Sequence, residues 1–251
     1  MHLTHFIGRA VVTLSLPLLA LPHLAHAQAR QETLLTTNWK FTKGDVPEAS
    51  KPDFKDAKWQ TVSVPHDWAI YGPFDGNNDL QKVQIEQNQE KAATLKAGRT
   101  GGLPFIGTGW YRRQLSVPNF GPGKRAVLLF DGAMSDAHVF VNGKEIGNWP
   151  YGYNSFSFDI TDALQANGSN VLAVRLQNQS EASRWYPGAG LYRNVHLIVT
   201  DDVHIPVWGT YITTPEINAD FAKVKLRTQV ATPNNAFQPL RLVTEIKDAQ
   251  G

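Results

Sequence analysis

The feature that most constrains the fold is a succession of short, alternating apolar segments over residues 110–200, separated by turn signals. Residues 137–141 and 144–146 flank Asn142 and Gly143. An Asn-Gly dipeptide in this setting is a strong hairpin signal, because both turn residues must adopt positive φ. Strands of this length at this spacing predict an all-β sandwich.

The apolar alternation also indicates which side chains form the core. Residues 34–41 begin the domain, with Trp39 and Phe41 on one strand face. Trp110 and Phe130 are assigned to the core. Further strands are predicted at residues 126–130, 156–160, 170–177 and 192–200.

Two stretches are less regular. Residues 53–59 indicate a short turn of helix. Residues 80–95 are consistent with a polar helix or with a long hairpin whose turn lies near Asn88. Because Val83 and Ile85 alternate with polar neighbours, the extended interpretation is favoured.

A domain boundary is predicted near Pro206. Beyond it, residues 224–230 and 240–246 alternate like strands. The whole segment after the boundary would hold about three strands, whereas an immunoglobulin-type sandwich needs about seven. We therefore expect residues 30–204 to form one domain and residues 207–251 to be the start of an immunoglobulin-like β-sandwich in a longer protein.

The N-terminus has the pattern of a secretory signal peptide over residues 1–27. An apolar run too short to span a bilayer precedes Ala25-His26-Ala27, which matches an Ala-x-Ala cleavage site. The chain has no cysteine, which excludes disulfides and thiol catalysis. A secreted or periplasmic bacterial protein is expected.

Charge and histidine spacing exclude several other functions. The formal net charge is +2, with both signs interspersed, so no nucleic-acid partner is expected. No later segment is long and apolar enough for a membrane helix. The eight histidines show no metal-binding spacing, and no cofactor is expected.

The connection over residues 183–195 is richer than a simple hairpin requires. Gly188 and Gly190 permit backbone angles that other residues avoid, and Pro187 fixes its own φ. The loop would present Arg184 and Trp185. One interpretation is that the aromatic residues plug the end of the sandwich; the other is that the loop lines a carbohydrate site, because indole faces and guanidinium donors suit sugar rings and hydroxyls.

His66 and Asp67 follow a predicted strand and a proline. A carboxylate can orient an imidazole, so the pair is compatible with a catalytic dyad. A structural corner is the favoured alternative, because no serine in a Gly-x-Ser-x-Gly setting accompanies the pair.

Several phrases taken together resemble family 2 of the glycoside hydrolases, the β-galactosidase and β-glucuronidase family. They occur in that family's order. They are Val64-Pro-His-Asp-Trp68, Gly109-Trp-Tyr-Arg112, Phe130-Asp-Gly132, His138-Val-Phe-Val-Asn-Gly143, Phe158-Asp-Ile-Thr161 and the segment 184–195.

The resemblance implies a jelly-roll, galactose-binding-like domain that packs on a catalytic (β/α)-barrel. In that family two barrel glutamates hydrolyse the glycoside with retention, and neither has a matching position here, so no catalytic residue is assigned. An acidic residue that helps to hold a metal ion in some branches is replaced here by Arg184, so no metal site is expected. The substrate-binding candidates are Arg184, Trp185, Asp67 and Arg99. As alternatives, Trp185 would lie in the core, Asp67 would cap a turn and Arg99 would be a solvated loop charge.

The leading hypothesis is the N-terminal part of a secreted exo-glycosidase acting on terminal β-D-galactosides. Its partners would be a β-galactoside and the C-terminal barrel of the same protein, with a homo-oligomer possible. Galactosides rank first because residues 66–68 and 99–104 most resemble that branch. A stand-alone carbohydrate-binding module and an adhesion or scaffold domain are the alternatives.

Overall fold

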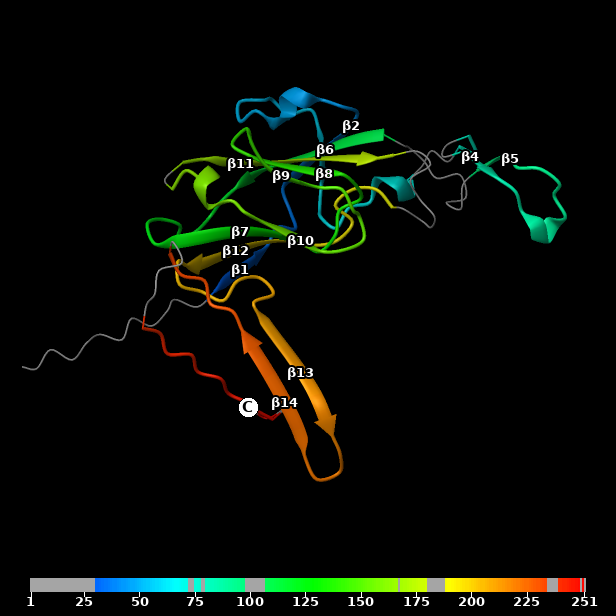
Figure 1. Cartoon of the computed structure of the whole chain (residues 1–251). Coiled ribbons are helices and arrows are strands. Elements are labelled where there is room, and N and C mark those ends of the chain that lie inside the picture. The colour runs from blue at the N-terminus through cyan, green and yellow to red at the C-terminus, as the bar shows by residue number, and fades with distance from the viewer. Residues whose placement is uncertain are drawn as a thin grey trace, which may run out of the picture.

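The computed structural model shows a two-layer β-sandwich from which a separate two-stranded hairpin projects (Figure 1). The residues that the structure describes are 30–71, 75–77, 80–97, 107–166, 168–179, 188–233, 239–248 and 250. The paired strands are antiparallel, as the alternating sequence pattern predicts.

One layer is a six-stranded sheet with the order β3-β2-β6-β11-β8-β9. Its central pair, β6 and β11, is in register from Leu115 opposite Asn170 to Gly107 opposite Asn178. The strands are β2 (Trp39–Lys43), β3 (Gln60–Val62), β6 (Gly107–Leu115), β8 (Ala137–Val141), β9 (Lys144–Trp149) and β11 (Asn170–Asn178).

The facing layer is a four-stranded sheet with the order β1-β12-β7-β10. Its strands are β1 (Gln31–Leu34), β7 (Lys124–Phe130), β10 (Phe156–Asp159) and β12 (Val195–Asp201). Four 3-10 turns connect strands: η1 (Pro47–Ser50), η2 (Trp68–Tyr71), η3 (Glu86–Asn88) and η4 (Thr161–Ala163).

The core lies between the two sheets and is built from alternate residues of each strand. Trp39 and Phe41 on β2 face Leu128 and Phe130 on β7, and each is at most 4% exposed. Phe130 also stacks on Phe156 at a centroid distance of 4.7 Å. This arrangement confirms the predicted all-β sandwich of jelly-roll type and the assignment of Phe130 to its core.

Trp110 is buried, but outside the space between the sheets. It lies on the outer face of the six-stranded sheet, stacked on Phe140 at 5.7 Å and clustered with Ala49 and Ala173. The segment after β2, which includes η1, covers this second cluster.

Several local predictions are confirmed. Asn142 and Gly143 have φ of 52° and 85° and connect β8 to β9. Residues 80–97 form a hairpin of β4 (Leu80–Val83) and β5 (Thr94–Ala97), with η3 at the turn near Asn88.

Other local predictions are wrong. The helical turn expected at 53–59 lies earlier, in η1, because Pro47 favours the first turn of a helix. β12 begins at Val195 rather than at residue 192, since the preceding residues bond to other segments. Residues 240–246 form no strand, although their side chains alternate, because no residue in the described part of the chain pairs with them.

The projecting hairpin consists of β13 (Thr210–Ile217), which the sequence pattern did not reveal, and β14 (Ala222–Thr228). At its base, His204 and Ala231 in the segments that lead into and out of the hairpin exchange both backbone hydrogen bonds. Across the ranges described, no helix has the length and apolarity needed to span a membrane.

Candidate functional site

One of the four predicted site residues, Asp67, lies at one end of the sandwich, beside residues 189–191. β11 ends there at Asn178, and the described residues resume at Gly188 after a gap over residues 180–187. Arg99, Arg184 and Trp185 lie outside the described residues. Asp67 is described, and backbone contacts define its surroundings.

Residues 189–191 are fixed to two other segments by backbone hydrogen bonds. The amides of His66 and Trp68 donate to the carbonyls of Leu191 and Ala189, at 2.7 and 3.0 Å. On the other side, Met134 and Gly190 exchange two bonds of 2.9 Å. The short segment is thus held like an extra strand between residues 66–68 and the start of the connection to β8.

Asp67 supplies a further link to this segment. Its Oδ1 accepts hydrogen bonds from the amide of Ala69 at 2.8 Å and from the amide of Ala189 at 3.0 Å. One carboxylate oxygen therefore caps η2 and joins it to a segment more than a hundred residues away. This is the turn-capping alternative for Asp67; its contact with a substrate remains a prediction.

The His66–Asp67 pair is not arranged as a catalytic dyad. His66 Nδ1 lies 2.7 Å from the hydroxyl oxygen of Tyr111, while Asp67 binds backbone amides. Burial raises the pKa of the Tyr111 phenol well above its usual value and lowers the pKa of His66. Both rings are therefore neutral near pH 7, and their hydrogen bond is structural.

Glycines allow this region to pack tightly. A Cβ at Gly190, where φ is +111°, would overlap the Tyr111 hydroxyl and lie 2.6 Å from the carbonyl oxygen of His66. A Cβ at Gly109 would lie 2.7 Å from the Trp68 indole. These glycines let Trp68 stack on Phe41 at a centroid distance of 5.4 Å beneath residues 188–191.

Exposed aromatic side chains, which the sequence interpretation did not select, surround this end. Tyr71 is 74% exposed and stacks on His66 at 6.1 Å. Tyr151 and Tyr153, in the loop between β9 and β10, are 57% and 43% exposed. The available signal was the Tyr-Gly-Tyr sequence directly after a strand.

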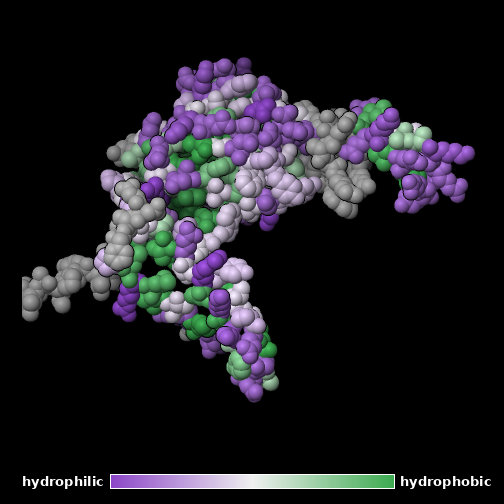
Figure 2. Space-filling view, in the orientation of Figure 1, coloured by the Kyte–Doolittle hydropathy of each residue, from purple (hydrophilic) through white to green (hydrophobic). Residues whose placement is uncertain are grey.

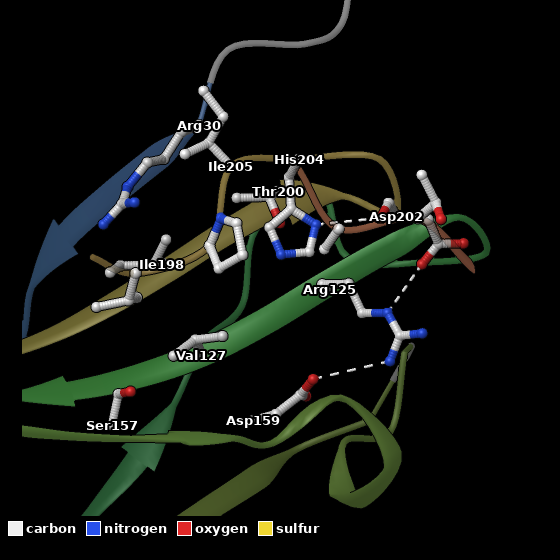
Figure 3. A pocket seen from close by; sticks show the side chains of 14 residues that line it. Arg30, Arg125, Val127, Ser157, Asp159, Ile198, Thr200, Asp202, His204 and Ile205 are labelled. Atoms are coloured by element: carbon white, nitrogen blue, oxygen red, sulfur yellow. Dashed lines mark hydrogen bonds and ion pairs between the residues drawn. The ribbon is translucent and has the colours of Figure 1, made fainter. Parts of the chain in front are cut away.

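A separate groove of about 320 Å³ lies on the outer face of the four-stranded sheet, where residues 204–207 cross it (Figure 3). Its apolar floor includes Val127 and Ile198. Arg125 is paired there with Asp202 at 3.0 Å and with Asp159 at 3.7 Å. The groove occupies the junction with the β13–β14 hairpin, and Asp67, the predicted site residue that the structure describes, does not line it.

No cluster of three or more His, Cys, Asp or Glu side chains in the described part of the chain is arranged to hold a metal ion. The neighbourhood of Arg184, where the resemblance implies an acid in other branches, lies outside that part. The expectation that this domain holds no metal ion therefore remains a prediction from the sequence.

Comparison with known protein families gives one match that covers most of the sandwich. Residues 33–201 match the family described as "Glycosyl hydrolases family 2, sugar binding domain". The matched stretch begins in β1 and ends with β12, so it contains both sheets and the segment 188–191.

Individual relatives agree with this match. A beta-galactosidase of Bacteroides ovatus, BoGH2A, is 36% identical over 223 residues, covering 88% of this chain and 24% of that protein. A beta-glucuronidase of Formosa agariphila is 28% identical, covering 85% of this chain and 22% of its own length. The chain thus spans about a quarter of the length of these relatives.

Solved structures share the fold. A glycosyl hydrolase family 2 member from Bacteroides cellulosilyticus superposes with a TM-score of 0.68 at 32% identity, over 82% of this chain and 25% of that one. A beta-glucuronidase from Bacteroides uniformis gives a TM-score of 0.63 at 29% identity, over 80% and 22% of the two chains.

Proposed function

Because the chain belongs to glycosyl hydrolase family 2 and contains that family's sugar-binding domain, we propose that it is the N-terminal part of an exo-glycosidase acting on terminal β-D-galactosides. Its role would be to form one wall of the sugar pocket, while the two catalytic glutamates are supplied by a barrel elsewhere in the whole protein. The reaction would be retaining hydrolysis, in which one carboxyl group protonates the leaving oxygen and the other attacks the anomeric carbon.

This proposal rests on the hydrogen bonds that hold the segments on either side of residues 180–187. On one side, the Gln177 amide and the Ser135 hydroxyl each form a 2.8 Å hydrogen bond between β11 and residue 135. On the other, residues 189–191 bond to residues 66–68 and to Met134. A fixed scaffold on both sides is what a binding loop requires, because pre-organisation lowers the entropic cost of binding.

Arg184 and Trp185 are the proposed substrate-side residues, with Asp67 and Arg99 in supporting positions. A galactoside ranks above a glucuronide because the 36%-identical relative is a beta-galactosidase, in agreement with the phrase at residues 66–68. Beta-glucuronidases are also among the relatives, so the two sugars must be compared directly.

We also propose that the protein is secreted. The support is the apolar N-terminal run followed by Ala25-His26-Ala27. Mass spectrometry of the mature protein from its host would give an N-terminus at Gln28. An N-terminus at Met1 would contradict the proposal.

Calorimetric titration of the chain with galactose and with glucuronate tests the sugar assignment. We expect saturable millimolar binding of galactose, weakened at least about fivefold by Trp185→Ala and by Arg184→Ala, since each removes a stacking or charged contact. Trp208→Ala is the matched control, because Trp208 is 64% exposed and lies in the connection to the hairpin.

Tighter binding of glucuronate than of galactose would contradict the galactoside assignment. Equal weakening by the Trp208 control would contradict the location of the site. Absence of binding for both sugars would contradict the sugar-pocket role itself.

A further inference from the structure

Exposed hydrophobic and aromatic side chains lie at several places in the described structure, and two of these places differ in chemical character. The β13–β14 hairpin exposes mainly aliphatic residues, among them Ile212 and Val224, which are 60% and 46% exposed. Figure 2 shows this hydrophobic surface along the hairpin and where it meets the sandwich. The loop between β9 and β10 instead exposes two tyrosines, Tyr151 and Tyr153, which we call the tyrosine pair.

The rings of the tyrosine pair lie next to each other, with centroids 5.5 Å apart and planes inclined at 56°. They are 57% and 43% exposed, so a large part of each ring faces solvent. Neighbouring aromatic rings that expose this much of their surface are typical of binding surfaces, where one side of each ring stays available to a ligand.

The loop that carries the pair is rigidly supported. The Tyr192 hydroxyl donates a 2.8 Å hydrogen bond to the carbonyl of Gly152, which lies between the two tyrosines. The Ser155 hydroxyl donates to the carbonyl of Asp131 at 3.1 Å. Gly152 itself packs against Met134 so closely that a Cβ at this position would overlap the thioether. The rings are therefore presented by a backbone with little freedom to move.

The same contacts connect the pair to the proposed sugar pocket. Tyr192 directly follows the anchored segment 189–191, and Met134 bonds to Gly190 in that segment. Burial raises the pKa of Tyr192, partly opposed by the Arg193 guanidinium, so its hydroxyl remains a hydrogen-bond donor at neutral pH. The pair and the anchored segment 189–191 thus share one structural support.

We propose that the tyrosine pair is a second saccharide-contacting surface, which binds sugar units beyond the terminal one in a β-linked galacto-oligosaccharide. Aromatic faces stack on the C–H faces of pyranose rings, while the tyrosine hydroxyls exchange hydrogen bonds with sugar hydroxyls. The exposed patch of the hairpin is mainly aliphatic, although it includes Tyr211 and Phe221, and it suits a protein partner better. The inference rests on the proposed function, since it extends the terminal-sugar pocket to a longer substrate.

The test is calorimetric titration of the full chain with galactose and with a β-linked galactotetraose. We expect the tetrasaccharide to bind at least about tenfold more tightly than galactose, because it adds contacts with two aromatic rings; tenfold corresponds to about 1.4 kcal/mol. The double variant Tyr151→Ala/Tyr153→Ala should lose this gain and keep the galactose affinity. The matched control Tyr151→Phe/Tyr153→Phe keeps both rings and should retain most of the gain.

Several outcomes would overturn the inference. A tetrasaccharide affinity equal to that of galactose in the unmodified chain, or one unchanged in the double alanine variant, would show that the pair contacts no sugar and would favour a protein partner. Galactose binding without a tetrasaccharide gain would leave the proposed function intact. Tetrasaccharide binding that depends on the tyrosine pair, without any galactose binding, would contradict the terminal pocket and support the pair. Circular dichroism melting of each variant would verify that the fold is retained.

Discussion

The sandwich and the β13–β14 hairpin bury their apolar side chains to very different degrees. Leu128 and Phe130 between the two sheets are 0% exposed, whereas Ile212 and Phe221 in the hairpin are 60% and 51% exposed. A two-stranded hairpin is marginally stable in isolation, while two packed sheets support themselves. The difference shows that the sandwich contains its own stabilising core. The hairpin, in contrast, exposes apolar side chains that the described residues do not cover.

The most direct test of this difference is to truncate one phenylalanine in each region. Phe130→Ala should lower the free energy of unfolding by about 3–5 kcal/mol, because it leaves a cavity between the sheets. Phe221→Ala should change it by no more than about 0.5 kcal/mol. Urea denaturation followed by tryptophan fluorescence measures both. Similar losses for the two variants would show that the hairpin shares the cooperative core.

A pair of glycine substitutions asks whether the contacts around residues 188–191 belong to that core. Gly190→Ala should cost about 2–4 kcal/mol, since it combines a positive φ with overlap onto Tyr111. The matched control is Gly44→Ala, where φ is +105° but nothing lies within 4 Å of the new Cβ. It should cost only about 1 kcal/mol, from the backbone conformation alone. Equal costs in urea denaturation would mean that the crowding at Gly190 is relieved by local movement.

Substitutions of Asp67 should have a smaller effect on stability, and they distinguish its structural role from a role in sugar binding. Asp67→Ala should lower stability by about 1–2 kcal/mol, because the amides of Ala69 and Ala189 lose their acceptor. Asp67→Asn keeps an oxygen acceptor and should restore most of this loss. Asp75→Ala, which removes only a local bond to the exposed Asn77 amide, is the control and should be neutral.

The measurement is urea denaturation together with galactose titration. A galactose affinity reduced in Asp67→Asn while its stability is retained would place the carboxylate in the sugar site. Destabilisation by Asp67→Asn as large as that by Asp67→Ala would contradict the capping role.

The smallest expected effect is on the pH dependence of stability. Burial lowers the folded pKa of His66 below its unfolded value of about 6.5. The neutral ring's contribution is therefore complete above the unfolded pKa and is lost as the pH falls from there through the folded pKa. Urea denaturation at about pH 7.5 and about pH 5.5 should show a smaller decrease for His66→Gln than for the unmodified chain. An equal decrease in both would assign the pH dependence to other groups.

Much of the sandwich could be predicted from the sequence because its strands follow a period of two and end at recognisable turns. The hairpin at Asn142-Gly143 is the clearest case, since the required backbone angles select these residues. The same periodicity was misleading at residues 240–246, because alternation does not reveal whether a partner strand exists. It missed β13 altogether, where Thr213 and Glu216 bracket an irregular register.

The candidate site was less predictable, for a related physical reason. Asp67 was selected as a substrate-binding candidate, and its cap on Ala189 could not be foreseen because it depends on a contact distant in sequence. Tyr151 and Tyr153 could not be distinguished from buried tyrosines until the packing of Gly152 on Met134 fixed their exposure. Residue type suggests chemistry, whereas only the tertiary neighbours decide which side chains face solvent.

The separate attachment of β11 and of residues 189–191 has an evolutionary consequence. Most of these bonds join backbone atoms: the amides of Gln177, His66 and Trp68 donate to the carbonyls of Ser135, Leu191 and Ala189. Such bonds persist when the side chains at these positions change, provided that the backbone keeps its path. The sequence at these attachment points can therefore diverge while the architecture around them is inherited unchanged.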